Sequence, residues 1–187
     1  MIRQCLTRLK HSTEHLNYGR DIVSTWAADY LSGLGKDTAN ILDIGLGSGT
    51  DILNIKKAIP NIDCNLYGIE SYEPSAERAR RNGINVANIN IECQPLPFEN
   101  GYFDIVIANQ IIEHTKEIFW IFSEISRVLK KGARVIIGVP NMASLHNRIA
   151  LLVGLHPTSS RLLSAHVRGI TKASFIPFIT CGGYFDV

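Results

Sequence analysis

Short apolar runs alternate with amphipathic stretches through the middle of the chain. The runs lie at residues 41–44, 65–69, 89–92, 103–108 and 134–139, and their length and content are typical of strands. The stretches with apolar positions at helical spacing lie at residues 50–58, 74–82 and 118–129. Strands that alternate with helices favour right-handed crossovers and a sheet covered on both faces. We therefore expect an α/β fold with a doubly wound, Rossmann-like and mostly parallel sheet.

Local signals mark the ends of the expected helices. A leading amphipathic helix is predicted over 21–31, with Gly33 as its stop. The helix at residues 74–82 begins on Pro74 and is followed by Gly83, as a proline in the first turn and a glycine past the end favour. The run Lys-Lys-Gly at residues 130–132 is expected to close the third helix, with cations at its negative end.

The rhythm changes after Pro140. Residues 141–155 predict a helix, residues 156–169 a loop and residues 171–179 a short helix. The apolar stretch at residues 149–155 is expected to pack in the core, and the alternative is a lid or a face toward a lipid-like substrate.

Composition narrows the class of protein. At 187 residues the chain has the length of one domain, which buries roughly 70% of the surface of the unfolded chain. The net charge is +2, and one short basic cluster at Arg78, Arg80 and Arg81 fits the solvated end of a helix, so we expect no nucleic-acid partner. No stretch approaches the 18 or so apolar residues of a membrane span, and the N-terminus lacks an apolar signal region. We expect a cytoplasmic protein.

The cysteine positions do not indicate a disulfide or metal-binding pattern. Cys5, Cys64, Cys93 and Cys181 are far apart and form no C-x-x-C pair. They predict reduced thiols and neither a disulfide scaffold nor a zinc knuckle.

A glycine-rich turn follows the first predicted strand, in the run Asp43-Ile-Gly-Leu-Gly-Ser-Gly49. Glycines allow a tight turn and a close backbone approach to a ligand, and the next helix offers unpaired N–H groups. The dinucleotide pattern G-x-G-x-x-G would need glycine at Thr50 or Ile52, so it is absent. Asp43 adds a negative charge that suits an ammonium or sulfonium ligand better than a pyrophosphate.

This turn resembles the first motif of the class I S-adenosylmethionine-dependent methyltransferases of type 11 or 23, and the resemblance extends over roughly residues 15–187. It implies that S-adenosyl-L-methionine is the cofactor. The residues that it assigns to the cofactor are Asp43, Gly45, Leu46, Gly47, Gly49, Glu70, Ser71, Glu92, Cys93, Asn109 and Tyr18. Glu70 ends the second predicted strand, where the family binds the ribose hydroxyls. A carboxylate can accept from both of them at once.

The resemblance also implies the surroundings of the adenine and of the methionine end. Glu92 takes the position that accepts from the adenine amino group, and the Cys93 backbone amide the position that faces the ring. The family commonly has aspartate where Glu92 stands. Asn109 follows the fourth predicted strand at the methionine end. Tyr18 stands where related enzymes have a lid residue.

The acceptor side offers fewer signals. Methyl transfer from a sulfonium needs mainly alignment and exclusion of water, so a base is not obligatory. His114, beside Glu113, is the candidate base for a hydroxyl acceptor, and His166 and Arg168 are candidate substrate contacts. Related quinone-pathway enzymes hold a divalent metal with an E-x-x-E-H segment. Here Gln110 replaces the first glutamate, so we expect no metal.

These inferences give one domain over residues 1–187: an N-terminal helical cap over 1–39, a cofactor-binding core over 40–140, and an acceptor-covering insertion with an incomplete C-terminal part over 141–187. The family's sheet normally has two further strands, of which residues 183–187 resemble only the beginning of the first. We therefore expect either that the chain is a fragment or that a partner, such as a second copy in a homodimer, covers the edge of the fifth strand. The expected activity is methyl transfer to an O, N or C atom of a small-molecule or glycan-like acceptor. The alternatives are a Rossmann-type NAD(P)-dependent oxidoreductase and a non-catalytic, methyltransferase-like partner protein.

Overall fold

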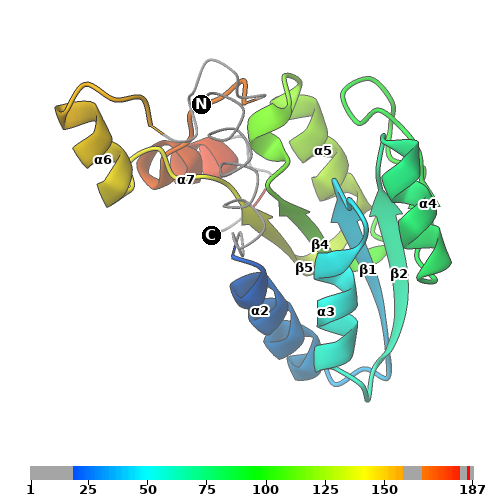
Figure 1. The fold of residues 1–187 in the computed structure, drawn as a ribbon. Helices are drawn as coiled ribbons and strands as arrows, with labels where there is room; N and C mark the ends of the chain where they lie inside the picture. The colour runs from blue at the N-terminus through cyan, green and yellow to red at the C-terminus, as the bar shows by residue number, and fades with distance from the viewer. Residues whose placement is uncertain (1–18, 158–165, 182–184, 186–187) are drawn as a thin grey trace, which may run out of the picture.

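The computed structural model describes residues 19–157, 166–181 and 185, which build a layered α/β structure (Figure 1). Its sheet has five strands in the order β3-β2-β1-β4-β5, and every pairing between them is parallel. The strands are β1 (Thr38–Ile44), β2 (Asp63–Ile69), β3 (Asn85–Ala87), β4 (Phe103–Asn109) and β5 (Leu129–Gly138). The order reverses beside β1, which confirms the expected doubly wound, Rossmann-like fold.

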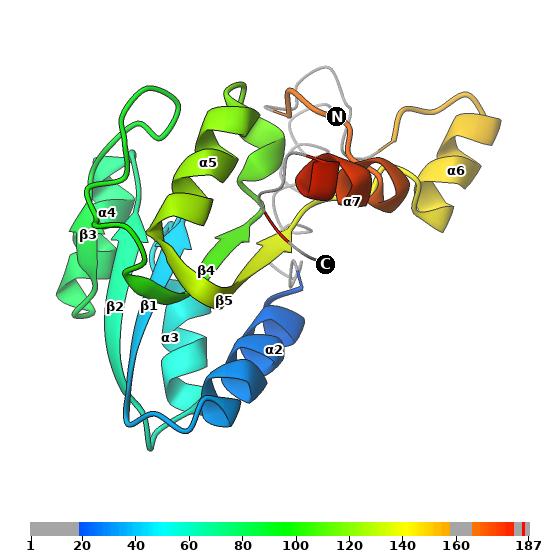
Figure 2. The ribbon, with the colours of Figure 1, turned by 180° about the vertical axis from the view of Figure 1, so that it is seen from behind.

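Helices cover both faces of the sheet (Figures 1 and 2). Helices α2 (Arg20–Gly33), α3 (Thr50–Ala58) and α4 (Glu73–Arg81) contribute to one buried cluster, and α5 (Ile118–Val128) and α7 (Lys172–Cys181) contribute to the other. A short 3-10 helix, η1 (Ile112–His114), follows β4. None of the helices in the described ranges is both long and apolar enough to cross a bilayer.

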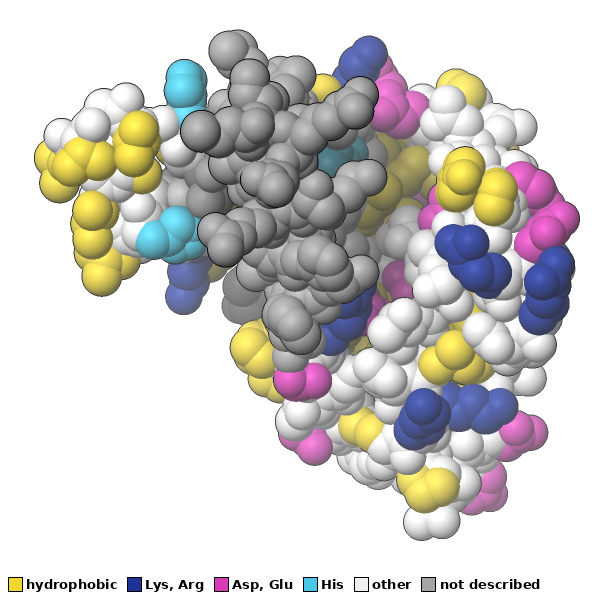
Figure 3. All heavy atoms as spheres, in the orientation of Figure 1, with side chains coloured by type: hydrophobic (Ala, Val, Ile, Leu, Met, Phe, Trp, Pro, Cys, Tyr) yellow, Lys and Arg dark blue, Asp and Glu magenta, His cyan; other side chains and the backbone are white. Residues whose placement is uncertain are grey.

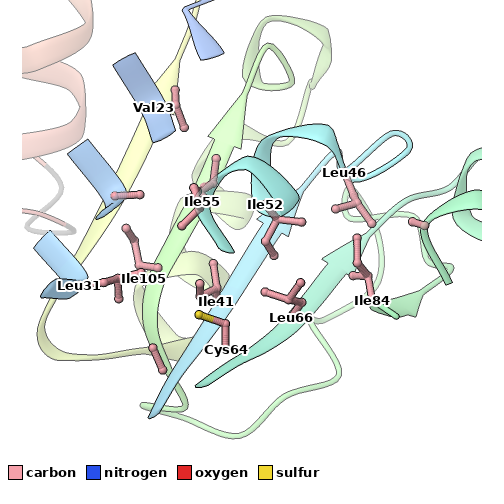
Figure 4. Close-up of a cluster of buried hydrophobic side chains, with 14 of the residues drawn as sticks. Val23, Leu31, Ile41, Leu46, Ile52, Ile55, Cys64, Leu66, Ile84 and Ile105 are labelled. Carbon is pink, nitrogen blue, oxygen red and sulfur yellow. The ribbon is translucent and has the colours of Figure 1, made fainter. Parts of the chain in front are cut away.

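The two clusters arise from the alternation of side chains along the strands. Ile41 points to the first cluster and its neighbour Leu42 to the second, because successive strand residues face opposite sides of a sheet. In the first cluster, Ile41 and Ile105 lie near Leu31 and Ile55, as Figure 4 shows. Both strand faces are therefore apolar, as a sheet between two helical layers requires.

The third strand differs from the prediction. It spans Asn85–Ala87 and pairs with β2, whereas residues 89–92 were expected to form it. Asn90 prevents a strand there, because its carbonyl accepts from the backbone N–H of Cys93 and Gln94, and its own N–H donates to the Gln94 side chain. The apolar run at 89–92 is thus a turn that lies against the sheet.

The end of the third long helix also differs. Helix α5 stops at Val128, and residues 129–132, which include the predicted helix end, belong to β5. Pairing with β4 decides this boundary, since Tyr102 donates its N–H to the Val128 carbonyl and Phe103 pairs with Leu129.

The segment after β5 forms less helix and less core than expected. Helix α6 spans Leu145–Leu152, and most of the apolar residues at 149–155 are exposed, so the expectation of core packing was wrong. Met142 donates its backbone N–H to the Ile170 carbonyl at 2.8 Å, which joins the start of this segment to the start of α7. The helix predicted over 171–179 is confirmed by α7. Of residues 183–187 only Phe185 is described.

A buried carboxylate ties the amino end of the sheet together. Asp104 accepts from the Asn40 backbone N–H at 3.0 Å and from the ammonium groups of Lys36 and Lys130, each at 2.7 Å. Burial alone would raise the pKa of Asp104, but the Asn40 N–H and the two ammonium groups outweigh it and hold the pKa below its usual range. Because the folded pKa is depressed, this carboxylate stabilises the fold above the unfolded pKa of about 4.

We predict that Asp104→Asn lowers the free energy of unfolding by about 1–3 kcal/mol at pH 7, because the amide loses the charge-assisted hydrogen bonds. Urea unfolding followed by circular dichroism measures this. The matched control Asp29→Asn changes an exposed carboxylate on α2 and should stay within about 0.5 kcal/mol. The cost of Asp104→Asn should shrink as the pH falls below about 4. A cost that does not depend on pH would contradict this account.

Candidate functional site

The site is built on the turn that leaves β1 at the carboxyl edge of the sheet, beside the reversal of strand order. In parallel α/β sheets this is where ligands bind. Gly45 and Leu46 donate their backbone N–H groups to the Ile69 carbonyl at the end of β2, both at 3.0 Å. The turn is therefore fastened to the neighbouring strand before it enters α3.

Three glycines in this turn adopt positive φ, but they serve different purposes. A Cβ on Gly45, at φ 75°, would lie 2.8 Å from Ile111, and a Cβ on Gly49, at φ 89°, would lie 2.3 Å from Ile84. These two glycines allow close packing. Gly47, at φ 56°, has nothing within 4 Å of a Cβ. It is needed for its backbone conformation, and it faces open space.

Glu70 follows β2 and folds back onto the glycine turn. Its Oε2 accepts from the Gly47 N–H at 2.8 Å, and its Oε1 accepts from the Tyr72 N–H at 2.7 Å. The carboxylate is thereby held between the turn and the start of α4.

A first pocket, of about 210 Å³, lies between the carboxyl ends of β1, β2 and β4. Its lining residues are Gly45, Ile69, Glu70, Ser71, Ile89, Asn90, Ile91, Glu92, Ile111, His114 and Thr115. Glu92 is oriented by the Lys116 backbone N–H, which donates to its Oε1 at 3.2 Å. The walls are apolar, with carboxylates on two sides.

The loop that follows Glu92 is hydrogen-bonded to helix α5. Glu124 of α5 accepts from the Leu96 N–H at 2.8 Å, and Arg127 donates to the carbonyls of Leu96 and Phe98. The pKa of Glu124 is lowered by its hydrogen bonds to Arg127. This pair thus ties the loop to α5 at Leu96 and Phe98.

A second pocket, of about 230 Å³, shares Gly45 with the first and lies on the other side of the turn. Asp51, in the first turn of α3, accepts from Arg20 Nε at 3.0 Å and from the Asn109 side-chain amide at 2.9 Å. Asn109 Oδ1 is buried and has no hydrogen-bond partner among the described residues. Gln110, at φ 57°, is the described non-glycine residue with positive φ, a strained conformation typical of functional sites.

The charged residues that line the second pocket are Arg20 and Asp51, and a further carboxyl group, that of Asp43, is buried nearby. Burial, followed by the charges of Asp51 and Glu70, raises the pKa of Asp43 well above its usual value, and Arg20 opposes this. Asp43 lies beneath the turn and does not line either pocket. The second pocket therefore offers a ligand both a cation, Arg20, and an anion, Asp51.

Glu113, His114 and His166 form a cluster beside the first pocket. One ligand atom from each lies within 4.8 Å of the others, and the two imidazole centroids are 4.6 Å apart. Glu113 is buried, and neither of its oxygens has a hydrogen-bond partner among the described residues, so burial raises its pKa. This trio has donor types that can hold a metal ion. The third donor is His166, which comes from a segment distant in sequence, whereas the E-x-x-E-H segment of related enzymes has a glutamate at the position of Gln110.

The segment that carries His166 is folded onto η1. Val167 donates its N–H to the Glu113 carbonyl at 2.9 Å, and Arg168 donates to the carbonyls of Thr115 and Lys116. Arg168 lines neither of the two pockets described above. Its guanidinium fastens the segment to the site instead.

The structure brings most of the predicted site residues together. Those that line one of the two pockets are Gly45, Leu46, Gly47, Glu70, Ser71, Glu92, Asn109 and His114. Gly49 packs against Ile84, and Cys93 is exposed and lines neither pocket. Tyr18 lies outside the described residues.

Sequence reasoning missed Arg20 and Asp51 as members of the second pocket. The available signal was an acidic residue in the first turn of the helix after the glycine turn. Its partner, 31 positions earlier, has no such signal. Gln110, which the sequence singled out as the replacement of a metal ligand, lines the second pocket.

A protein-family model described as a methyltransferase domain matches residues 42–137, which include the glycine turn and all lining residues of the two pockets except Arg20. An uncharacterized protein in transposon TN4556 of Streptomyces fradiae is 32% identical over 107 residues, which cover 56% of this chain and 31% of that protein. The demethylmenaquinone methyltransferase of Lactococcus lactis is 30% identical over 117 residues, which cover 59% of this chain and 46% of the relative. The chain spans about a third to a half of the length of these relatives.

Solved structures show the same fold. A possible histamine N-methyltransferase from Thermotoga maritima superposes with a TM-score of 0.60 at 20% identity, over 94% of this chain and 78% of that one. A methyltransferase from Archaeoglobus fulgidus superposes with a TM-score of 0.60 at 22% identity, over 86% of this chain and 66% of that one.

We predict that Gly45→Ala lowers the free energy of unfolding by about 2–5 kcal/mol, because strain at positive φ adds to overlap with Ile111. The control Gly35→Ala, at φ 61° with nothing within 4 Å of its Cβ, carries only the strain of about 1–2 kcal/mol. Urea unfolding measures both. Adding Ile111→Ala should recover part of the loss at Gly45 and none at Gly35. Equal costs for the two glycine variants would refute the packing role.

Proposed function

The chain belongs to the methyltransferase domain family, whose members use S-adenosyl-L-methionine, and on this premise we propose that it transfers the methyl group of that cofactor to a small-molecule or glycan-like acceptor. The observation that carries the proposal is the 2.8 Å hydrogen bond between Gly47 and Glu70. It sets a carboxylate beside a glycine turn at the reversal of strand order, where a nucleoside cofactor needs an acceptor for its hydroxyls.

The two pockets fit the two halves of this cofactor. The first pocket, with Glu70, Ser71 and Glu92 on apolar walls, has the chemistry of a nucleoside site. The second pocket, with Asp51 and the orphaned oxygen of Asn109, suits an ammonium group, and Arg20 suits a carboxylate. Their combined volume lies in the range of roughly 300–1,000 Å³ that ligand pockets occupy. We assign the cofactor to both pockets, joined at Gly45.

The bound cofactor would supply a sulfonium with an electrophilic methyl group. The protein's part is then to align the acceptor and to exclude water, which can supply about 7–11 kcal/mol of the barrier. We propose His114 as the base when the acceptor is a hydroxyl, because it lines the first pocket and has Glu113 and His166 beside it.

The names of the relatives do not indicate a single acceptor. One is named for demethylmenaquinone, and a second, 29% identical over 135 residues, is the 27-O-demethylrifamycin SV methyltransferase of Amycolatopsis mediterranei. These names describe chemically different acceptors on one kind of domain. We therefore propose the reaction class and leave the acceptor to be identified with labelled cofactor and fractionated metabolites.

Calorimetry with S-adenosylhomocysteine and with NAD separates the proposal from its first rival. Heat with the former and none with the latter supports methyl transfer, and the reverse result would make the chain an oxidoreductase. A non-catalytic role is the second rival. It predicts binding of S-adenosylhomocysteine without transfer of label to any metabolite.

We predict that Glu70→Gln weakens binding of S-adenosylhomocysteine about 10- to 100-fold, since the hydrogen bonds of a charged acceptor contribute roughly 1.5–3 kcal/mol. Isothermal calorimetry measures the dissociation constant. Glu77→Gln makes the same change on the exposed face of α4 and should leave it within twofold. Thermal unfolding of both variants checks that the fold is retained. Unchanged affinity in folded Glu70→Gln would remove Glu70 from the site.

We predict that His114→Ala lowers kcat for a hydroxyl acceptor by about 100-fold or more, as loss of a general base does. The dissociation constant for S-adenosylhomocysteine should change much less, because Glu70 and the glycine turn remain. His156→Ala, at an exposed position, is the control. Transfer of labelled methyl measures kcat. If His114→Ala retains full kcat, the base is elsewhere or is not needed.

A further inference from the structure

Helix α6 carries an exposed apolar surface that no described part of the chain covers. We name as the α6 patch the residues Leu145, Ile149, Leu151, Leu152, Val153 and Leu155, each of which exposes more than half of its surface. Single exposed apolar residues are ordinary, but six of them within eleven consecutive residues form a contiguous patch. Such a patch marks a surface that meets something other than water.

The geometry of the helix separates an inner from an outer face. Asn147 is 2% exposed and donates to the Asn141 carbonyl at 3.2 Å, which holds one side of α6 to its base. At 3.6 residues per turn, Leu145, Ile149 and Leu152 lie within a narrow stripe on the opposite side. The apolar stripe therefore faces outward because the opposite side of α6, at Asn147, is attached to the rest of the fold.

Charge around the α6 patch is of one sign. Residues 141–181, which include α6 and α7, contain four of the chain's 19 Lys and Arg residues and none of its 17 Asp and Glu residues. Arg148 lies in α6, and Lys172 starts α7, which is joined to the base of α6 by the hydrogen bond between Met142 and Ile170. In Figure 3 the α6 end of the molecule shows hydrophobic side chains beside histidine and a Lys or Arg, with no acidic side chain among them.

We propose that the α6 patch docks on the surface of an anionic phospholipid membrane. An apolar stripe flanked by cations is the pattern of helices that lie in the membrane interface, where the apolar side chains enter the acyl boundary and the cations meet lipid phosphates. Such docking is peripheral, because it places only the outer face of one helix in the membrane interface.

A second copy of the chain fits the patch less well. In a symmetric dimer the same patch faces itself, so the cations of one copy would meet the cations of the other. No Asp or Glu in residues 141–181 is available to pair with them. An anionic surface satisfies both the apolar and the charged part of the patch.

The position of α6 gives this docking a consequence for the site. The chain enters α6 from the carboxyl end of β5, which is the same edge of the parallel sheet at which the glycine turn leaves β1. Docking through α6 would therefore hold that edge of the sheet toward the membrane side (Figure 1).

Vesicle co-sedimentation of the full chain tests the proposal. Vesicles of equal parts phosphatidylglycerol and phosphatidylcholine should bind the protein at 50 mM salt. Pure phosphatidylcholine should bind it at least tenfold less, and 500 mM salt should weaken the binding to the anionic vesicles. The double variant Ile149→Ser, Leu152→Ser should bind anionic vesicles at least tenfold more weakly, since it removes apolar side chains from the outer stripe. Arg148→Glu should weaken binding to anionic vesicles and not to neutral ones.

A matched control uses the exposed apolar residues of another helix. Ile22→Ser, Trp26→Ser changes two exposed side chains on α2, beside Asp21 and Asp29, and should bind vesicles as the unchanged chain does. Thermal unfolding and S-adenosylhomocysteine affinity, unchanged in the α6 variant, show that it is folded. Absence of binding to anionic vesicles, or equal loss in both double variants, overturns the proposal. So does a dimer in light scattering that the α6 variant alone dissociates, which would assign the patch to a second copy.

Discussion

The parallel pairing of β1 with β2 is the constraint on which the site depends. Ile44 pairs with Ile69, so the glycine turn and Glu70 leave the sheet side by side. The turn then donates two N–H groups to Ile69 and one to Glu70. A one-residue slip in this register would turn the side chains of β2 to the opposite faces of the sheet and would separate the carboxylate from the turn. The hydrophobic alternation that fixes the register of β1 and β2 thus also keeps Glu70 beside the glycine turn.

Burial of charge around the turn follows from the same arrangement. Asp43 lies under the turn, Asp51 starts the helix that follows it and Glu70 closes its other side. Burial raises the pKa of Asp43 well above its usual value, and the nearby charges of Asp51 and Glu70 raise it further. Arg20 offsets only part of this charge. Among the charged groups around the turn, the Glu70 carboxylate and the paired Asp51 are the ones that can attract a cationic group of the proposed cofactor.

The region after β5 is built differently from the sheet core. Arg168 fastens the segment around His166 to η1 through backbone carbonyls, and the bond between Met142 and Ile170 joins the bases of α6 and α7. This region is therefore held by a few hydrogen bonds, whereas the sheet core is held by two continuous apolar clusters. The outer stripe of α6 is left to solvent, which makes this region the part of the fold best suited to meeting a surface. Its cationic character, without acidic residues, favours an anionic one.

Hydrophobic alternation and the glycine turn determined the fold class, the strand and helix order and the place of Glu70, because these depend on local periodicity and on the steric freedom of glycine. Tertiary structure decided the features that depend on contacts between residues far apart in the sequence. The pairing of Phe103 with Leu129 drew residues 129–132 into β5, and the turn at Asn90 moved the third strand. Arg20 and His166 reached the site from segments far from it in sequence. The exposure of α6 was decided in the same way, because an apolar run looks alike whether the fold buries it or leaves it bare.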